Sequence, residues 1–331
     1  MPETAELNDL SDLRAPWCLR VAVTLRVAER IAAGVTGISE LAAASNCDQE
    51  ALHSVLGHLV SKGVFEEPSP GRFALNDAAR RLMEPSSRLG LDLEGIGGRM
   101  SYAWGTLLTY VRTGTTAYHE AFGMSFWDDL QAHAEIGASF DALMGPPGHG
   151  TPNADLELAG DWNRVRTVVD VGGGTGAMLA EVLKAHPAIK GTLLDLPATV
   201  ARSAGILEAA GVADRVTLVG QSFFDPLPAG ADLYILKGVL NDWPEAETVR
   251  ILRRCAEAAR PDGAIVILGG VMPDDAPRHR TIAPDMLVAG GKTNTLSEFR
   301  ELARQAALEV VSAGSHASGG FVVECRPATA A

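Results

Sequence analysis

The pattern of hydrophobic and polar positions predicts two parts of different architecture. In the first part, apolar residues recur at helical spacing over 14–34, and a helix, a turn and a second helix follow before residue 63. Two short strands around the turn Pro68–Gly71 complete the pattern of a winged helix. Asp48 is the expected N-cap of the second helix. The expected buried stripe of that helix consists of Leu52, Val55, Leu56, Leu59 and Val60.

The second part begins near Val168, where short apolar segments alternate with amphipathic ones. The expected strands are TVVDV (167–171), GTLLDL (191–196), RVTLVG (215–220), DLYILKGVL (232–240) and AIVILGGV (264–271). Between them we expect helices that end near His186 and Ala210, and one that spans 245–260. This alternation predicts an α/β fold with a parallel sheet, closed by a hairpin over 308–327.

The segment between these parts, residues 95–160, is predicted to be mostly helical. Two stretches interrupt it, GTTAYHEAFG (114–123) and the Gly/Pro-rich GPPGHGTPN (145–153). We expect the second stretch to act as a hinge or a flap.

Composition and charge exclude several classes of function. The 331 residues, 47% of them hydrophobic, suffice for two cores. A formal net charge of −13 argues against a nucleic-acid partner and against an anionic membrane surface. In a DNA-binding winged helix the second helix would carry several basic residues. Here DQEALHSVLGHLVSKG (48–63) has two acids and one lysine, so a structural or dimerising role is favoured over that of a DNA-binding regulator.

The chain ends and the cysteines indicate a reduced, cytoplasmic protein. The acidic start lacks the apolar core of a signal peptide, and no apolar run is long enough to span a membrane. The four cysteines are scattered without a CxxC pair, so we expect no zinc or other metal site.

The stretch VVDVGGGTGAMLAEVL (168–183) predicts a strand, a glycine-rich loop and a helix that bind a nucleotide. Asp170, Gly172, Gly174 and Gly176 fit an S-adenosylmethionine loop, although Gly172, Gly174 and Ala177, with Asp195 ending the next strand, also fit the dinucleotide fingerprint. Asp170 would repel a pyrophosphate but attract an ammonium or a sulfonium, which favours S-adenosylmethionine. Asp195 is placed to accept hydrogen bonds from ribose hydroxyls. The alternative is that both aspartates merely cap the turns that follow them.

At this point the chain resembles the O-methyltransferases of plants and actinomycetes that modify small aromatic molecules. The resemblance spans residues 15–324 and rests on VVDVGGGTG, TLLDLP, VGQSFFDPLP, LYILKGVLNDW, ILRRCAEAARPDG, the GGK turn at 290–292 and LSEFRELARQAALEV. It implies a Rossmann-like class I methyltransferase domain with an N-terminal, mainly α, winged-helix domain. The implied parts are a dimerisation domain (1–95), a helical linker that lines the pocket (96–160) and a catalytic domain that binds S-adenosylmethionine (161–331). The protein is then expected to be a homodimer acting on an aromatic or polyketide-like small molecule.

The resemblance also implies roles for individual residues. The cofactor would be bound by Asp170, Gly172, Gly174, Asp195, Leu196, Ser222, Phe223, Lys237 and Trp243. Phe223 would stack on the adenine. The acceptor pocket would be lined by Phe126, Trp127, Phe140, Met144 and Met286, although each of these is equally compatible with an ordinary core position.

The sequence departs from the family at the catalytic step. The usual V-L-H-D-W run is VLNDW here, so Asn241 replaces the histidine base beside Asp242 and Trp243. The two glutamates that orient that histidine in the family are also missing, at Gly269–Val271 and at Thr293–Asn294. His149, His279 and His316 are alternative bases, but an isolated loop histidine is more often simply solvated.

Two hypotheses follow from this departure. The first is O-methyl transfer in bacterial secondary metabolism by positioning alone, with Asn241 and Asp242 in the catalytic site and without a histidine base. The second is a non-methylating enzyme on the same fold, a cyclase, hydroxylase or decarboxylase, that keeps the cofactor as an electrostatic or structural element.

Overall fold

The computed structural model describes residues 7–149, 151–152, 162–276, 287–315 and 320–328. The chain divides into two compact units, Met1–Ser101 and Tyr102–Ala331. The division into three parts at residues 95 and 160 stays a prediction.

The first unit is mainly helical and contains the predicted two-stranded wing. Its elements are α1 (Leu7–Ser11), α2 (Arg14–Thr24), α3 (Val27–Ala32), α4 (Ile38–Ser45), α5 (Gln49–Ser61), β1 (Phe65–Ser69), β2 (Arg72–Leu75), α6 (Asp77–Arg81), α7 (Pro85–Leu91) and α8 (Ile96–Ala103), which crosses the boundary. Asp48 caps α5 as predicted, because its carboxylate accepts the N–H of Ala51 at 2.8 Å. Three residues of the predicted stripe of α5 are buried (Leu52, Leu56 and Leu59), and the other two pack against them.

The region 14–34, predicted to be helical, forms two helices, α2 and α3, and not one continuous helix. Arg26 has a φ of 55°, in the left-handed region, and therefore separates α2 from α3.

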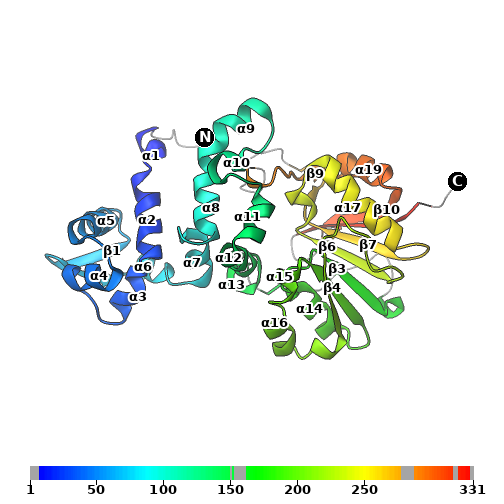
Figure 1. Ribbon diagram of the computed structural model, residues 1–331, viewed down its shortest axis with the longest axis horizontal. Coiled ribbons are helices and arrows are strands. Elements are labelled where there is room, and N and C mark those ends of the chain that lie inside the picture. Colours follow the sequence, from blue (N-terminus) through cyan, green and yellow to red (C-terminus); the bar gives the residue numbers. More distant parts are fainter. Residues whose placement is uncertain (1–6, 150, 153–161, 277–286, 316–319, 329–331) are drawn as a thin grey trace. The chain divides into compact units, whose positions relative to one another are not determined.

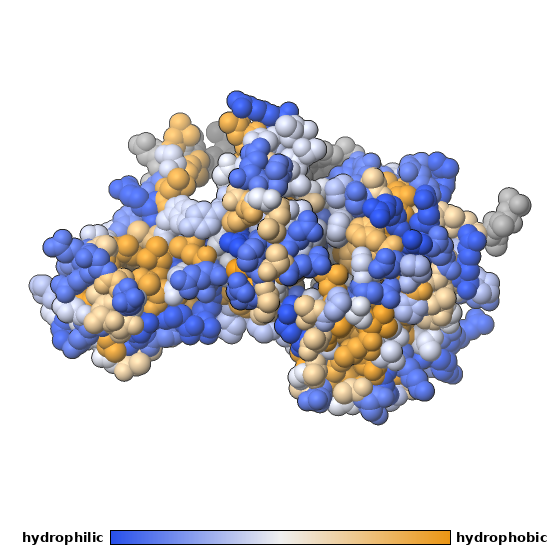
Figure 2. Space-filling view, in the orientation of Figure 1, coloured by the Kyte–Doolittle hydropathy of each residue, from blue (hydrophilic) through white to orange (hydrophobic). Residues whose placement is uncertain are grey.

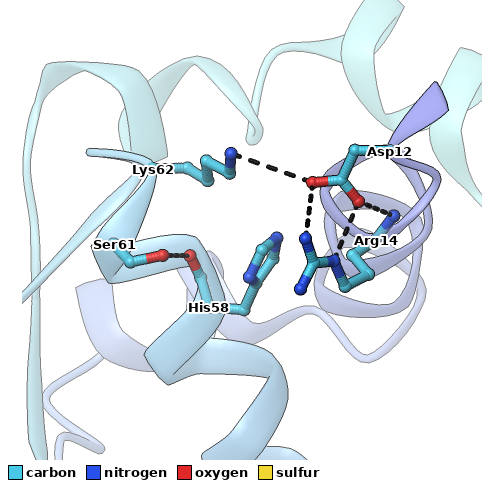
Figure 3. A network of polar contacts seen from close by, with 5 residues as sticks. All are labelled: Asp12, Arg14, His58, Ser61 and Lys62. Carbon is cyan, nitrogen blue, oxygen red and sulfur yellow. Dashed lines mark hydrogen bonds and ion pairs between the residues drawn. The ribbon is translucent and has the colours of Figure 1, made fainter. Parts of the chain in front are cut away.

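The polar residues near the start of α2 contact the end of α5 (Figure 3). There the Asp12 carboxylate accepts the backbone and side-chain N–H groups of Arg14 at 2.9 Å and lies 3.8 Å from the Lys62 ammonium. Hydrogen bonds from Arg14 lower the pKa of Asp12 to about 2.

The second unit is built around a seven-stranded sheet (Figure 1). The strand order is β10-β11-β7-β6-β3-β4-β5. β3 to β7 pair in parallel, whereas β11 pairs antiparallel with both β7 and β10. The predicted parallel sheet and closing hairpin are therefore present. The strands are β3 (Thr167–Val171), β4 (Lys190–Asp195), β5 (Val216–Gly220), β6 (Leu233–Lys237), β7 (Ala264–Leu268), β10 (Leu308–Ser315) and β11 (Phe321–Pro327).

Helices cover both faces of this sheet. On one face, α14 (Ala177–Ala185) and α16 (Ala204–Ala209) pack on alternate strand residues such as Val168, Leu193 and Ile235. On the other face, α17 (Glu245–Ala258) and α19 (Leu296–Gln305) pack on Val169, Tyr234 and Ile267. Burial on both faces explains why the central strands β3, β4, β6 and β7 read as apolar runs.

Two strands end earlier than their apolar runs predict. β6 ends at Lys237 rather than at residue 240, because Gly238 has a φ of 65° and the chain then enters the 3-10 turn η4 (Leu240–Asp242). β7 ends at Leu268, because Gly269 and Gly270 have φ values of 85° and 75°. The residues beyond them form β8 (Val271–Met272), which pairs with β9 (Asn294–Thr295).

Between residue 104 and the sheet lies a series of short helices. They are η1 (Trp104–Thr106), α9 (Leu107–Thr113), α10 (Tyr118–Phe122), α11 (Phe126–Ala132), α12 (Ala134–Met144), α13 (Pro146–His149) and η2 (Trp162–Arg164). Two more short helices, α15 (Pro197–Val200) and η3 (Ala213–Arg215), lie in the connection between β4 and β5. The stretches expected to interrupt this region are partly helical, since they contain α10 and α13.

Large apolar side chains are exposed on α1 and on α9, among other elements. Leu7 and Leu10 of α1 are 79% and 71% exposed, and Leu108 and Val111 of α9 are 60% and 66% exposed. Figure 2 shows apolar residues at the surface over both helices. Within the described residues, the structure contains no helix that combines the length and the apolar character needed to cross a membrane.

Candidate active site

The glycine-rich loop lies at the carboxyl edge of the sheet, where β3, β4 and β6 end side by side. Gly172, Gly174 and Gly176 all have positive φ, between 60° and 84°. The amides of Gly172 and Gly173 donate to the Leu194 carbonyl at 2.8 and 3.2 Å, which ties the loop to β4. A β-carbon at Gly172 would lie 2.9 Å from Val239 and 3.3 Å from Phe223, so the loop can only be this compact with glycine there.

Asp170 is a buried carboxylate with little compensation. Its side chain is 1% exposed, and neither oxygen has a hydrogen-bond partner of normal geometry among the described residues. Burial, reinforced by the charge of Asp195, raises its pKa to about 7, against the weaker opposing effects of Lys237 and the Leu179 amide. Because an unpaired buried carboxylate is costly, the site is suited to a cation supplied by a ligand.

Asp195 closes the other side of the loop. Its two oxygens accept the amides of Gly174 at 2.8 Å and of Leu196 at 2.7 Å. Burial raises its pKa, and these two amides oppose the rise. The capping alternative is therefore part of the structure, but an ionised carboxylate has about four acceptor positions, which leaves capacity for ligand hydroxyls.

The polar run that follows β6 carries Asn241 at the position where the family has a histidine. Lys237 is exposed, and its charge acts on Asp170. The Asn241 side-chain NH2 donates to Asp242 Oδ1 at 2.9 Å, so the acceptor atom of this side chain is its Oδ1. An amide cannot take up a proton at ordinary pH, so Asn241 can orient a hydroxyl but cannot act as its base.

Two glycine turns pack directly on Asn241. A β-carbon at Gly269 would lie 3.9 Å from Asn241 Oδ1, one at Gly270 would lie 3.0 Å from its backbone N, and one at Gly291 would overlap its carbonyl oxygen. The first of the two positions expected to carry the family's glutamates, Gly269–Val271, therefore does lie against residue 241. Neither expected position holds a carboxylate, because residues 269–271 are Gly-Gly-Val and residues 293–294 are Thr-Asn.

Aromatic side chains from distant segments meet above this edge. Trp127 stacks on Trp243, with ring centroids 5.4 Å apart and planes 11° apart. Phe140 lies edge-on to Trp127 at 5.9 Å, and Phe223 lies edge-on to Trp243 at 5.7 Å. Phe126 contacts both Trp127 and Phe140. We call these five residues the aromatic row; it joins the residues expected at the acceptor with those expected at the cofactor.

Polar contacts position the helices that carry the aromatic row. The Tyr118 hydroxyl of α10 donates to the buried Asp129 carboxylate of α11 at 2.6 Å, and His133 Nδ1 lies 2.7 Å from the other oxygen. The Thr116 hydroxyl donates to the Leu287 carbonyl at 2.7 Å, next to the glycine turn at 290–291.

The remaining predicted residues take less central places. Ser222 Oγ accepts the amide of Phe224 at 3.2 Å and so shapes the turn beside Phe223. Met144 is 44% exposed at the end of α12, and His149 Nδ1 contacts the Leu143 carbonyl. Met286, His279 and His316 lie outside the described residues. The sequence did not single out the contact between Asp141 of α12 and Arg202, because a pair 61 positions apart leaves no local pattern.

The residues of this edge fit S-adenosylmethionine. The orphaned Asp170 matches a cationic ammonium or sulfonium, the glycine loop permits close approach of the ligand, and Asp195 retains acceptor capacity. Among the described residues, no cluster of histidine, cysteine or carboxylate side chains could hold a metal ion.

Comparison with known proteins gives the same picture. A family model described as the O-methyltransferase domain matches residues 104–309, and one described as the O-methyltransferase dimerisation domain matches residues 8–85. The 2,7-dihydroxy-5-methyl-1-naphthoate 7-O-methyltransferase of Streptomyces carzinostaticus is 38% identical and aligned over 93% of each chain. Aclacinomycin 10-hydroxylase of Streptomyces purpurascens is 35% identical over 92% of this chain and 84% of its own.

A solved structure extends this similarity to the cofactor. It is that of an O-methyltransferase from neocarzinostatin biosynthesis in complex with S-adenosylmethionine and 2-hydroxy-5-methyl naphthoic acid. It matches with a TM-score of 0.88 and 37% identity, over 98% of this chain and 99% of its own. The chain therefore belongs to the S-adenosylmethionine-dependent O-methyltransferase family with an N-terminal dimerisation domain.

Proposed function

We propose that the protein methylates an oxygen of a planar, largely apolar aromatic or polyketide-like molecule in bacterial secondary metabolism, and that it does so by positioning, without a side-chain base. The observation that carries this proposal is the aromatic row, which leads without a break from Phe140 to Phe223. A planar acceptor bound along it would lie beside the cofactor edge of the sheet.

On the donor side, we assign the cofactor to the residues around the glycine loop. Asp170 attracts the positive charge of the cofactor, and Gly172 and Gly174 allow its close approach. Asp195 accepts hydrogen bonds from the ribose hydroxyls and, together with Leu196, orients the ribose and the adenine. Phe223, next to Ser222, provides a face for the adenine ring, while Lys237 and Trp243 border the same site. When bound, S-adenosylmethionine supplies an electrophilic methyl group on a positively charged sulfur.

On the acceptor side, Phe126, Trp127 and Phe140 hold the rings and Asn241 holds the oxygen. Asp242 fixes the Asn241 amide, so Asn241 Oδ1 accepts a hydrogen bond from the hydroxyl group of the substrate and sets the direction of that hydroxyl. The acceptor oxygen then forms a bond to the methyl carbon while the carbon–sulfur bond breaks and its electron pair returns to sulfur. The products are the methyl ether and S-adenosylhomocysteine, and the phenolic proton passes to water. Met144 and Met286 remain expected pocket residues.

Magnitudes make transfer without a base reasonable. A general base typically contributes about 10²–10⁴-fold. Correct placement of the two reacting atoms can supply about 7–11 kcal/mol. A phenol beside a carbonyl or carboxylate group is already acidified and needs little help to lose its proton.

We also propose that the working form is a homodimer assembled through the first unit. The match to the O-methyltransferase dimerisation domain over residues 8–85 and the exposure of Leu7 and Leu10 support this. We assign no role in binding nucleic acid or membranes, because the net charge of −13 disfavours both partners.

A second candidate function is a non-methylating reaction that retains the cofactor. Its support is the loss of the base and of both glutamates, together with the similarity to the aclacinomycin 10-hydroxylase. Such an enzyme would bind S-adenosylmethionine but form no S-adenosylhomocysteine.

The two candidates are separated by incubating the purified protein with methyl-labelled S-adenosylmethionine and 1,4-dihydroxy-2-naphthoic acid, a compound bound by the neocarzinostatin enzyme. The same acid with both hydroxyls already methylated is the control. We expect labelled product and equimolar S-adenosylhomocysteine with the first acid only. An unlabelled new product would contradict the proposed O-methylation, and label transfer to the dimethylated acid would contradict a phenolic hydroxyl as the acceptor.

A further inference from the structure

An ion pair joins the acceptor helix α12 to the segment that follows the ribose carboxylate. Arg202 Nε donates to Asp141 Oδ2 at 2.8 Å, and Arg202 Nη2 lies 2.5 Å from the same oxygen. Asp141 directly follows Phe140 of the aromatic row. Arg202 comes seven positions after Asp195, just beyond the one-turn helix α15. The pair thus bridges the two halves of the candidate site.

A second contact joins α12 to the glycine-rich loop. A β-carbon at Gly145, the C-cap of α12, would lie 3.5 Å from Thr175 Oγ1. The carboxyl end of α12 therefore rests against the loop that carries Gly172 and Gly174. Both elements that we assign to the cofactor are in contact with the same helix.

The environment of the pair favours a role in orientation over a role in stability. The Asp141 side chain is only 9% exposed and that of Arg202 is 31% exposed. Burial raises the pKa of Asp141, and hydrogen bonds from Arg202 and Thr199 oppose that rise. Buried ion pairs add little net stability but define geometry sharply, because two donors on one oxygen tolerate few arrangements.

We propose that Asp141 and Arg202 are positioning residues that transmit the binding of the cofactor to the acceptor wall. A ligand that immobilises Asp195 and the glycine loop also immobilises Arg202 and Thr175, and both contact α12. The helix, with Phe140 on it, is then fixed for the acceptor only when the donor is in place. This inference rests on the proposed cofactor site and extends it to residues that do not touch the reacting atoms.

The test measures hydrogen exchange of the α12 amides with and without S-adenosylhomocysteine in the full-length protein. At a concentration 100-fold above Kd, amides that exchange only from the ligand-free form slow by up to about 100-fold. We expect this slowing in α12 of the wild type and its loss in the double variant Asp141→Asn/Arg202→Met. The double variant removes both charges together, so it leaves no unpaired buried ion and should still bind S-adenosylhomocysteine by calorimetry.

Two further variants complete the design. The pair Glu301→Gln/Arg304→Met removes an exposed ion pair of α19 and should leave the protection of α12 unchanged. Asp141→Asn alone keeps the size of the side chain, so it serves if the double variant does not fold, and it should also reduce the protection.

Equal protection of α12 in the wild type and in a variant that binds S-adenosylhomocysteine would overturn the inference. So would a wild type that binds the compound without any slowing in α12. Failure of the wild type to bind S-adenosylhomocysteine at all would instead refute the proposed function, and calorimetry identifies that case first.

Discussion

Replacing Asp170 by asparagine should stabilise the ligand-free protein while weakening cofactor binding. The folded-state pKa of Asp170 is about 7 and its ordinary value is 3.8, a difference of about 3 units. At about 1.4 kcal/mol per unit, the ionised group costs the folded protein up to about 4 kcal/mol above pH 7. Asparagine removes the charge but leaves a buried amide with unmet hydrogen bonds, which costs about 1–3 kcal/mol. The expected net gain at pH 8 is therefore about 1–3 kcal/mol.

The sign of the pH dependence follows from the raised pKa. Between pH 4 and pH 7 the folded wild type binds a proton at Asp170 that the unfolded chain does not bind. Its stability therefore falls as pH rises through this range and levels off above pH 7. Asp195 adds to this effect and Lys237 opposes it. The advantage of Asp170→Asn should be full at pH 8 and should shrink as pH falls towards 4.

Thermal unfolding at pH 5 and pH 8, with and without S-adenosylhomocysteine, provides the measurement. A gain of 1 kcal/mol corresponds to about 2–4 °C for a domain of 150–250 residues. Asp232→Asn is the matched control of opposite sign, because Asp232 accepts three hydrogen bonds from Arg166 and Thr167 that lower its pKa. A lower Tm for Asp170→Asn at pH 8 would refute the burial argument. Unchanged affinity for S-adenosylhomocysteine would refute the assignment of Asp170 to the cofactor.

Three further substitutions test separate parts of the site. Asn241→Ala should lower kcat/KM for the acceptor by about tenfold or more, because one hydrogen bond is lost, and should leave the Kd for S-adenosylhomocysteine unchanged. Full activity of this variant in a turnover assay would exclude the proposed role of Asn241. Gly172→Ala should weaken S-adenosylhomocysteine binding in calorimetry, because a β-carbon at this position is crowded by Val239 and costs about 1 kcal/mol or more at a φ of 67°. Wild-type affinity of this variant would count against a close approach of the ligand to the backbone of Gly172. Trp127→Ala should raise KM for the acceptor and leave KM for the cofactor unchanged, whereas the reverse pattern in steady-state kinetics would place Trp127 at the donor.

The parallel sheet was predictable because its central strands β3, β4, β6 and β7 are largely buried and each ends in a recognisable turn. Where the predicted bounds were wrong, at the ends of β6 and β7 and at Arg26, the cause is backbone conformation. Gly238 ends β6 three residues early, and Arg26 breaks the helix predicted over 14–34 in a residue type that seldom adopts positive φ. Apolar periodicity continues through both positions, so it carries no signal for either break.

The chemistry of the site was predictable only where a local motif accompanied it. Asp170 stands near the end of β3, two residues before the glycine loop, and Asp195 is the last residue of β4, so both lie at the carboxyl edge of the sheet. The stacking of Trp127 on Trp243 joins positions 116 residues apart, and the pair of Asp141 and Arg202 joins positions 61 residues apart. Such contacts arise from the packing of α11 and α12 and leave no pattern in the chain.

The central claim is that the protein transfers a methyl group without a side-chain base. The most direct measurement uses methyl-labelled S-adenosylmethionine, the purified protein and an extract of a producing strain that lacks its gene. We predict that label appears in one small molecule, with one S-adenosylhomocysteine formed per label transferred, and that Asn241→Ala reduces the rate without abolishing the reaction. A new product that carries no label would contradict methyl transfer and would make the glycine loop a holder for a cofactor that is not consumed.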